Sequence, residues 1–169
     1  MTRHKTSNKQ IDLNKRRLFT FYKKLHEHEA KEHKTVARPP YAVEEILFKR
    51  LCTGCGNCQA ACPNEIINII DGLAEIDVSY TPCDVCGECQ KACQTLALSQ
   101  QETATGLIAR ISSTCDNLTS YCNNCEGTCN FNALIWQENR TPSIDQEKCI
   151  GCGFCITTCF INAISMTMA

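Results

Sequence analysis

The sequence has little of what normally builds a large apolar core or a membrane anchor. Aromatic residues make up 7% of its 169 residues, and there is a single Trp. The longest apolar stretches, such as Ala133–Trp136, fall far short of the roughly 20 residues that a membrane span requires. Residues 1–40 contain no apolar run of the kind found in a secretory signal peptide. We therefore expect a cytoplasmic protein without a membrane span, whose interior is organised by something other than apolar side chains.

Motifs of the common enzyme classes are also missing. The chain has no Walker A loop, no G-x-G-x-x-G after a strand-like run and no Ser/His/Asp order. No two carboxylates are placed for acid–base catalysis. These absences predict that the chain is not an enzyme acting on a small molecule by itself.

Cysteine, in contrast, is abundant, with 16 among 169 residues. The cysteines form four groups of four, which are Cys52, Cys55, Cys58 and Cys62; Cys83, Cys86, Cys89 and Cys93; Cys115, Cys122, Cys125 and Cys129; and Cys149, Cys152, Cys155 and Cys159. Groups 1, 2 and 4 follow C-x2-C-x2-C-x3-C without exception, whereas group 3 has a longer loop between its first two cysteines. The distances between groups pair the first with the second and the third with the fourth, which indicates two repeated modules.

Disulfides, zinc and iron–sulfur clusters are the three ways in which so many cysteines could organise a core. Thiols in the cytosol are kept reduced, which disfavours a disulfide framework. Zinc sites need only two cysteines per knuckle, and would not repeat a third and a fourth at fixed offsets. The repeated spacing is that of bacterial [4Fe–4S] proteins, so we predict four [4Fe–4S] clusters held through iron by all 16 cysteines.

The ligands are expected to cross between the two groups of a module. In two-cluster ferredoxins the fourth cysteine of each motif ligates the cluster of the partner motif. By this rule the four ligand sets are Cys52, Cys55, Cys58 and Cys93; Cys83, Cys86, Cys89 and Cys62; Cys115, Cys122, Cys125 and Cys159; and Cys149, Cys152, Cys155 and Cys129. The long loop of group 3, residues 116–121, is expected to bulge outward and to make that cluster the most exposed or labile.

The predicted fold class is α+β. We expect two bacterial ferredoxin-like two-cluster modules with short β-hairpins and brief helical turns, preceded by a basic N-terminal segment. The expected boundaries are 1–50 for the N-terminal segment, 51–104 for module 1 and 105–169 for module 2. A short apolar run follows the fourth cysteine of each group, and it is predicted to form a strand paired with the strand before the next group, such as 73–78 or 107–111.

The N-terminal segment differs from the rest in charge. Residues 1–50 hold 13 of the 17 Lys and Arg against six Asp and Glu, together with all four His. Leu18, Phe21, Tyr22 and Leu25 follow helical spacing and predict a short amphipathic helix. The His residues alternate with Glu and Lys in 26–34 and predict a solvated face rather than a metal site. The scarcity of interleaved aromatics disfavours nucleic acid, so we expect the segment to meet an acidic protein or the acidic body of its own chain.

Three features beyond the cysteines carry a resemblance to a known family. They are the leader Lys15-Arg16-Arg17-Leu18-Phe19-Thr20, the element Arg38-Pro39-Pro40-Tyr41 and the stretched third motif from Cys115 to Cys122. Together with four cluster motifs, they resemble the NapF family, the ferredoxin-type accessory proteins of periplasmic nitrate reductase. Segment 19–37 is longer and more charged than expected for that family.

The resemblance implies a function and a partner. It implies a cytoplasmic protein that contacts the molybdenum and iron–sulfur catalytic subunit of periplasmic nitrate reductase before export, and assists its cluster acquisition or its redox state. We expect the protein to be a monomer. The residues expected to bind this partner are Arg16, Arg17, Arg38, Pro39, Pro40 and Tyr41. The alternative is a polyferredoxin that carries electrons to an oxidoreductase. The electron-input subunit of a larger enzyme complex is a third possibility, and it predicts permanent association with a flavin or molybdenum partner.

Overall fold

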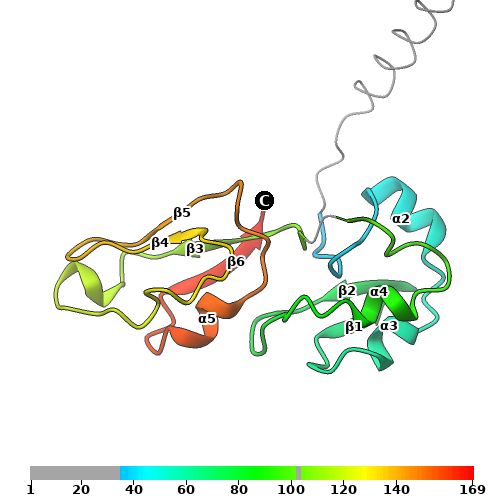
Figure 1. The fold of residues 1–169 in the computed structure, drawn as a ribbon, viewed down its shortest axis with the longest axis horizontal. Coiled ribbons are helices and arrows are strands. Elements are labelled where there is room, and N and C mark those ends of the chain that lie inside the picture. Colours follow the sequence, from blue (N-terminus) through cyan, green and yellow to red (C-terminus); the bar gives the residue numbers. More distant parts are fainter. Residues whose placement is uncertain (1–34, 102–103) are drawn as a thin grey trace, which may run out of the picture. The chain divides into compact units, whose positions relative to one another are not determined.

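A computed structural model of the chain describes residues 35–101 and 104–169. In its first half, three short helices surround a two-stranded hairpin (Figure 1). These elements are α2 (Glu45–Leu51), α3 (Asn57–Ala60), β1 (Ile67–Ile70), β2 (Leu73–Ile76) and α4 (Glu88–Ala92). The turn between β1 and β2 is Asp71–Gly72, where both residues have positive φ, of 49° and 76°. This is the backbone that a two-residue hairpin requires, and Asp-Gly favours it.

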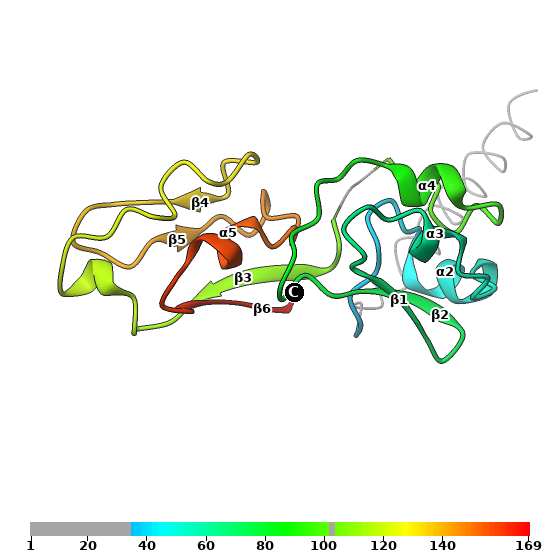
Figure 2. The ribbon, with the colours of Figure 1, turned by 90° about the horizontal axis from the view of Figure 1, so that it is seen from below.

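The second half contains four strands, one α-helix and one turn of 3₁₀ helix. They are β3 (Leu107–Ile111), η1 (Asp116–Leu118), β4 (Leu134–Ile135), β5 (Ser143–Ile144), α5 (Phe154–Thr158) and β6 (Ile164–Met168). β3 pairs with β6 over five residues, and β4 pairs with β5, both antiparallel. Figure 2 shows α5 beside the β3–β6 pair from a second direction. The described residues therefore form small helices and three two-stranded sheets, in agreement with an α+β fold of two ferredoxin-type halves.

Strand prediction was correct for three of the four cysteine groups. The apolar runs after Cys62, Cys129 and Cys159 become β1, β4 and β6. The run after Cys93 does not form a strand, and Leu96 within it has a φ of 62°. Its backbone is instead held by the chain just after Pro40: Val43 N–H donates to Ala97 O at 3.0 Å, and Gln100 N–H donates to Tyr41 O at 2.8 Å. β3, which was expected to pair with that run, pairs with β6.

Residues 35–51 belong to the core of the first half rather than to a separate leader. Phe48 of α2 is fully buried, and Ala42 and Val43 are also buried, together with Ile67 and Leu98 of the same cluster. The expected boundary at residue 50 therefore falls too late, because it cuts this core. The predicted amphipathic helix and His-rich face lie outside the described residues.

Arg38 is the most unusual member of that core, because its charged side chain is 2% exposed. Its guanidinium donates to both carboxylate oxygens of Glu45, at 2.8 and 3.1 Å, and to Ala74 O at 3.0 Å. It also lies over the ring of Phe48, 4.9 Å from the ring centroid. Burial raises the pKa of Glu45, but the hydrogen bonds and the charge of Arg38, together with those of Lys49, outweigh this and hold that pKa below its usual value.

This geometry corrects part of the expected partner surface. Arg38, Pro39 and Pro40 are all buried, and a partner could reach them only if the core opened. Arg38 fastens the entering chain to α2 through Glu45 and to β2 through Ala74. Tyr41 is half-buried, and its hydroxyl donates to Val85 O at 3.0 Å. Arg16 and Arg17 lie outside the described residues.

Candidate metal-cluster sites

The 16 cysteines surround four separate cavities, with four thiols around each. We call them site 1 (Cys52, Cys55, Cys58 and Cys93), site 2 (Cys62, Cys83, Cys86 and Cys89), site 3 (Cys115, Cys122, Cys125 and Cys159) and site 4 (Cys129, Cys149, Cys152 and Cys155). The cavities are nearly equal in size, at about 330, 340, 370 and 350 Å³ including the part open to solvent. Each contains three cysteines from one group and the fourth cysteine of its partner group. The structure thus brings together the sets expected from the spacing, while ligation itself stays a prediction.

Short helices produce this crossing in groups 1, 2 and 4. Each helix begins after a glycine with φ near 80° (Gly56, Gly87 and Gly153), a left-handed conformation that glycine adopts without a Cβ penalty. The third cysteine lies within the helix and lines the cavity of its own group. The fourth cysteine follows the helix and lines the partner's cavity; Cys93 and Cys159 are extended C-cap residues. One helical turn therefore separates two thiols that serve different sites.

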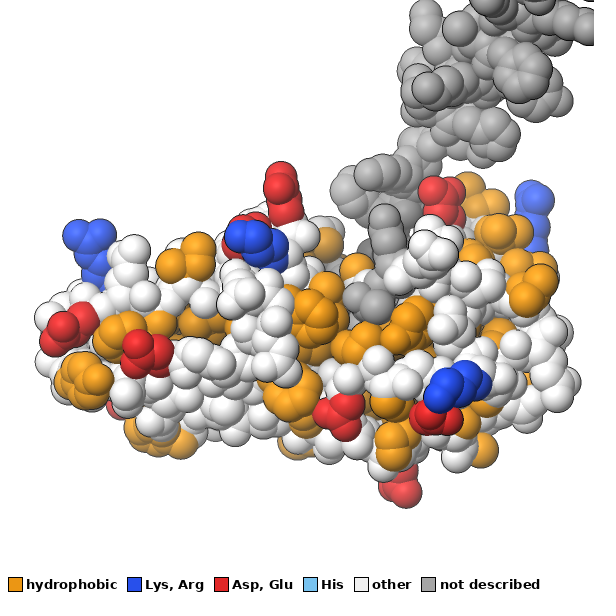
Figure 3. Space-filling model, in the orientation of Figure 1, with side chains coloured by type: hydrophobic (Ala, Val, Ile, Leu, Met, Phe, Trp, Pro, Cys, Tyr) orange, Lys and Arg blue, Asp and Glu red, His pale blue; other side chains and the backbone are white. Residues whose placement is uncertain are grey.

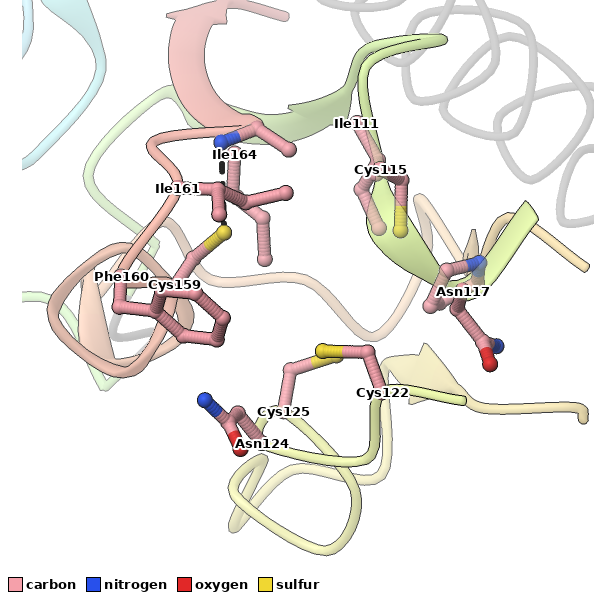
Figure 4. Close-up of a pocket in the computed structure, with 12 residues that line it drawn as sticks. Ile111, Cys115, Asn117, Cys122, Asn124, Cys125, Cys159, Phe160, Ile161 and Ile164 are labelled. Atoms are coloured by element: carbon pink, nitrogen blue, oxygen red, sulfur yellow. Dashed lines mark hydrogen bonds between the residues drawn. The ribbon is translucent and has the colours of Figure 1, made fainter. Parts of the chain in front are cut away.

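Group 3 reaches the same arrangement without a helix. Asn123 stands where the other groups have glycine, and the residues that follow it form turns. In Figure 4 the sulfurs of Cys115, Cys122, Cys125 and Cys159 face a common space bordered by Ile111 and Ile164. The longer spacing in this group is thus compatible with the same four-thiol cavity.

The inserted loop of group 3 is fastened rather than free. Asn117 is 1% exposed, and its side-chain amide donates to Gln137 O and Arg140 O, both at 2.7 Å. Trp136 Nε1 donates to Cys122 O at 3.0 Å, and the rings of Trp136 and Tyr121 meet edge to face. The loop does expose Leu118 and Tyr121, as an outward bulge would.

Cysteine exposure does not single out site 3. The two exposed cysteines are Cys55 of site 1 and Cys86 of site 2, whereas the four of site 3 are buried or intermediate. The expectation that the third cluster would be the most exposed is therefore wrong at the level of its ligands. The hydrogen bonds of Asn117 and Trp136 explain why.

Replacing Asn117 with alanine should loosen this loop. The change removes both hydrogen bonds from the buried Asn117 amide to Gln137 O and Arg140 O, each of which contributes about 0.5–1.5 kcal/mol. We expect a lower unfolding midpoint and faster release of iron from the protein to a chelator. Thr119→Ala, on an exposed residue of the same loop, is the control and should behave as wild type. Equal release rates for both variants would show that Asn117 does not hold the loop.

Two of the fourth cysteines receive a backbone hydrogen bond that the motif alone did not reveal. Ala133 N–H donates to Cys129 Sγ at 3.3 Å, and Ala163 N–H donates to Cys159 Sγ at 3.2 Å. Both alanines stand four residues after their cysteine and are buried, and Ala97 has the same relation to Cys93. Donors aimed at sulfur stabilise negative charge on it. The available sequence signal was the repeated C-x3-A, which sequence analysis had described only as an apolar run.

The pKa values of the thiols indicate that thiolates in these cavities need a positively charged centre beside them. Burial, and then the charge of neighbouring thiols, raises the pKa of Cys83 to about 11 and those of Cys89 and Cys155 to about 12. Burial acts in the same direction on Cys93, but hydrogen bonds from Thr95 and from nearby backbone N–H groups outweigh it and lower its pKa. Four thiolates sharing one buried cavity therefore require a positively charged centre.

An iron–sulfur cluster fits this donor set better than a single ion does. All four donors around each cavity are sulfur, as in [4Fe–4S] proteins. Zinc would need its four sulfurs about 2.3 Å from one centre. Across residues 35–101 and 104–169, no three His, Cys, Asp or Glu side chains are grouped closely enough to hold one metal ion. The geometry thus favours a bulkier centre.

The described surface is mildly acidic and carries scattered apolar side chains. Residues 35–101 and 104–169 contain seven Lys and Arg against thirteen Asp and Glu. On the face drawn in Figure 3, charged side chains are dispersed among apolar ones rather than gathered in one patch. None of the helices found in the described part of the chain has the length and apolar character needed to cross a membrane.

Comparison with known proteins supports the iron–sulfur interpretation. The profile of the family described as "4Fe-4S dicluster domain" matches residues 46–94, and that described as "4Fe-4S binding domain" matches residues 142–165. The first match spans groups 1 and 2, and the second spans group 4. Group 3, whose spacing departs from the motif, lies outside both matches, so its place in a four-thiol cavity rests on its spacing and on the structure.

Relatives cover most of the chain. An uncharacterized protein of Haemophilus influenzae is 41% identical over 135 residues, which are 79% of this chain and 79% of the relative. The ferredoxin-type protein NapF of the same organism is 31% identical over 147 residues, 83% of this chain and 84% of the relative. The ferredoxin-type protein NapF of Escherichia coli K12 is 30% identical over 135 residues, 76% of this chain and 82% of the relative.

Proposed function

Because this chain belongs to the NapF family of ferredoxin-type 4Fe–4S proteins, which are carrier or accessory proteins and not enzymes, we propose that it matures an oxidoreductase. Its partner is the catalytic subunit of periplasmic nitrate reductase, and the two meet in the cytoplasm before that subunit is exported. The protein binds four [4Fe–4S] clusters as a monomer and supplies the subunit with clusters or with the electrons they carry. The domain division is a leader, module 1 with sites 1 and 2, and module 2 with sites 3 and 4.

The observation that supports this proposal is the grouping of all 16 thiols into four cavities of similar size. When bound, the clusters supply one-electron chemistry or transferable iron and sulfide. The protein's residues hold them: three thiols from one group and one from the next fasten each centre to two parts of the chain. Exposed Cys55 and Cys86 are the ligands that a partner could approach without unfolding the core.

The test is an anaerobic mixing experiment. The protein, loaded with isotopically labelled iron, is mixed with the cluster-free catalytic subunit of nitrate reductase, and the two are then separated. Label in the subunit together with recovered activity is expected for a cluster donor. Tight association with recovery of activity but without label would assign the electron-supplying form of the same role. Absence of any association would overturn the maturation role and favour the general electron carrier.

The burial of Arg38 decides how the leader is tested. A deletion of residues 1–34 keeps the Arg38–Glu45 pair, whereas a longer deletion would remove a core residue and confuse unfolding with loss of binding. In a maturation factor that uses Arg16 and Arg17 as partner contacts, the deletion should abolish association and leave the iron content unchanged. A diffusing carrier should still accept electrons at the wild-type rate after the deletion, and should show no association with the subunit before or after it.

A further inference from the structure

Sites 2 and 4 meet through a direct backbone contact between two of their cysteines. Cys83 N–H donates to Cys152 O at 2.7 Å, and this is among the shortest backbone hydrogen bonds between the two modules. Cys83 lines site 2 and Cys152 lines site 4. Cys83 is 8% exposed, and Cys152 packs against the same apolar cluster, so the contact is largely shielded from water.

Glycine makes this close approach possible. A Cβ placed on Gly153 would lie 2.8 Å from Val78 Cβ and 2.9 Å from Val78 O, which are impossible separations for packed atoms. Gly153 also has a φ of +88°, so both its conformation and its surroundings call for glycine. The loop that holds the second and third cysteines of group 4 is therefore shaped to lie against module 1.

A second set of hydrogen bonds fixes the same loop. Thr105 is fully buried, and its hydroxyl lies 3.1 Å from both Ile150 O and Gly151 O. Thr105 N–H donates to Ile150 O at 3.0 Å, and Thr105 O accepts from Arg38 N–H at 3.0 Å. The buried entry segment of module 1 is thus tied through one residue to the group 4 loop.

Sites 1 and 3 take no part in this junction. The residues that line site 1 all fall within 48–98, and those that line site 3 all fall within 111–164. Each of these sites is joined to its neighbour inside the module by short helices. In module 1, α3 leads from Cys58 of site 1 to Cys62 of site 2, and α4 leads from Cys89 of site 2 to Cys93 of site 1. In module 2, α5 leads from Cys155 of site 4 to Cys159 of site 3.

We propose that the four sites form one electron path in the order 1, 2, 4, 3, with the Cys83–Cys152 contact as the link between modules. The inference rests on the proposed function in one respect, the presence of four clusters. In the transfer across the link, the cluster held at site 2 would lose one electron and the cluster held at site 4 would gain it. A one-electron reductant feeds one end of the path, and an iron–sulfur oxidoreductase accepts at the other. Each end has an exposed side chain beside it, Cys55 at site 1 and Phe160 in the lining of site 3.

The order of the sites is tested in full-length double variants, each of which lacks one ligand at two of the four sites and so keeps only the other two clusters. Cys55→Ser with Cys122→Ser should leave sites 2 and 4, and Cys86→Ser with Cys149→Ser should leave sites 1 and 3. After reduction by dithionite, low-temperature EPR should show spin–spin interaction in the first protein and two independent signals in the second. Interaction in the second protein and none in the first would overturn the order.

The link is tested in the protein that keeps all four sites. Gly153→Ala should push the group 4 loop from Val78, and the matched control is Gly127→Ala, because Gly127 also has positive φ but nothing within 4 Å of an added Cβ. Electrons delivered in a short pulse of reduced viologen should equilibrate between modules more slowly in Gly153→Ala than in the control. Thr105→Val, which removes the hydroxyl that holds the group 4 loop without changing a residue of that loop, should slow the same step and serves if Gly153→Ala does not fold.

Iron and sulfide analysis separates the two ways of failing. Fewer than four clusters in the wild-type protein would overturn the cofactor content of the proposed function. Four clusters, with equilibration equally fast in Gly153→Ala, Thr105→Val and the control, would leave the proposed function standing and overturn the link. If only Gly153→Ala loses the iron of site 4, the rate of equilibration in Thr105→Val decides whether the link exists.

Discussion

Replacing Arg38 with methionine should lower the free energy of unfolding by about 3–5 kcal/mol, because it removes the guanidinium that binds both oxygens of the buried Glu45 carboxylate and leaves that carboxylate with the half-exposed Lys49 at 3.6 Å. Glu45 is 3% exposed and keeps both carboxylate oxygens on the guanidinium, and its lowered pKa means that it is ionised at neutral pH. The methionine would also withdraw the donor from Ala74 O and the cation from the face of Phe48. Denaturant unfolding of the cluster-loaded protein under anaerobic conditions measures the loss.

Two further variants show whether the pair itself is responsible. Arg38→Met combined with Glu45→Met should recover much of the lost stability, since an apolar pair of similar volume leaves no uncompensated charge. Lys91→Met, in the exposed pair with Glu88, should leave stability nearly unchanged. If Arg38→Met unfolds like wild type and loses only its binding partner, the original assignment of Arg38 to the partner surface would be restored.

The consequence for site 1 should be visible in the same protein. Phe48 lines the cavity of site 1 and lies under Arg38, and Ala74, whose carbonyl accepts from Arg38, lines the same cavity. Withdrawal of the guanidinium therefore loosens two walls of that cavity. Iron should be released from the variant faster than from wild type, and site 1 should empty first.

The parts of the structure that sequence reasoning predicted are those fixed by short-range spacing. In C-x2-C-x2-C-x3-C the third cysteine lies in a helical turn and the fourth follows just after it. The spacing of these two cysteines is therefore enough to predict that their thiols line different cavities. The Asp71–Gly72 turn is equally local, because both residues favour the positive φ that the hairpin requires. Even group 3, with its longer spacing, conserves the offset between Cys125 and Cys129 that places these two thiols at different sites.

The parts that sequence reasoning missed depend on contacts between distant segments. Arg38 carries a charge in a basic stretch, and only the position of Glu45 and Phe48 after folding shows that it is buried. The run after Cys93 has a strand-like composition, but residues 41–43 already supply its backbone partners, and so no strand forms. β3 pairs with β6 at the other end of module 2, a choice that apolar alternation cannot distinguish from pairing with the nearer run.

Crossed ligation makes a second prediction with a large effect. Cys93 belongs to group 2 by sequence, yet it lines site 1 with Cys52, Cys55 and Cys58. Cys93→Ser should therefore remove the same cluster as Cys58→Ser, with the loss of about four of about 16 iron atoms in each case. Because metal binding and folding are coupled in such small cores, both variants should also lower the unfolding midpoint of module 1.

The comparison that decides it is Cys89→Ser, four residues before Cys93 and in the same helix–cap unit, but lining site 2. Difference EPR spectra of the reduced proteins should show the same missing signal in Cys93→Ser and Cys58→Ser, and another in Cys89→Ser. If Cys93→Ser and Cys89→Ser instead lacked the same EPR signal, each motif would ligate its own cluster. The electron path could then no longer rely on α4 and α5 as its links within the modules, since each helix would carry two ligands of a single site.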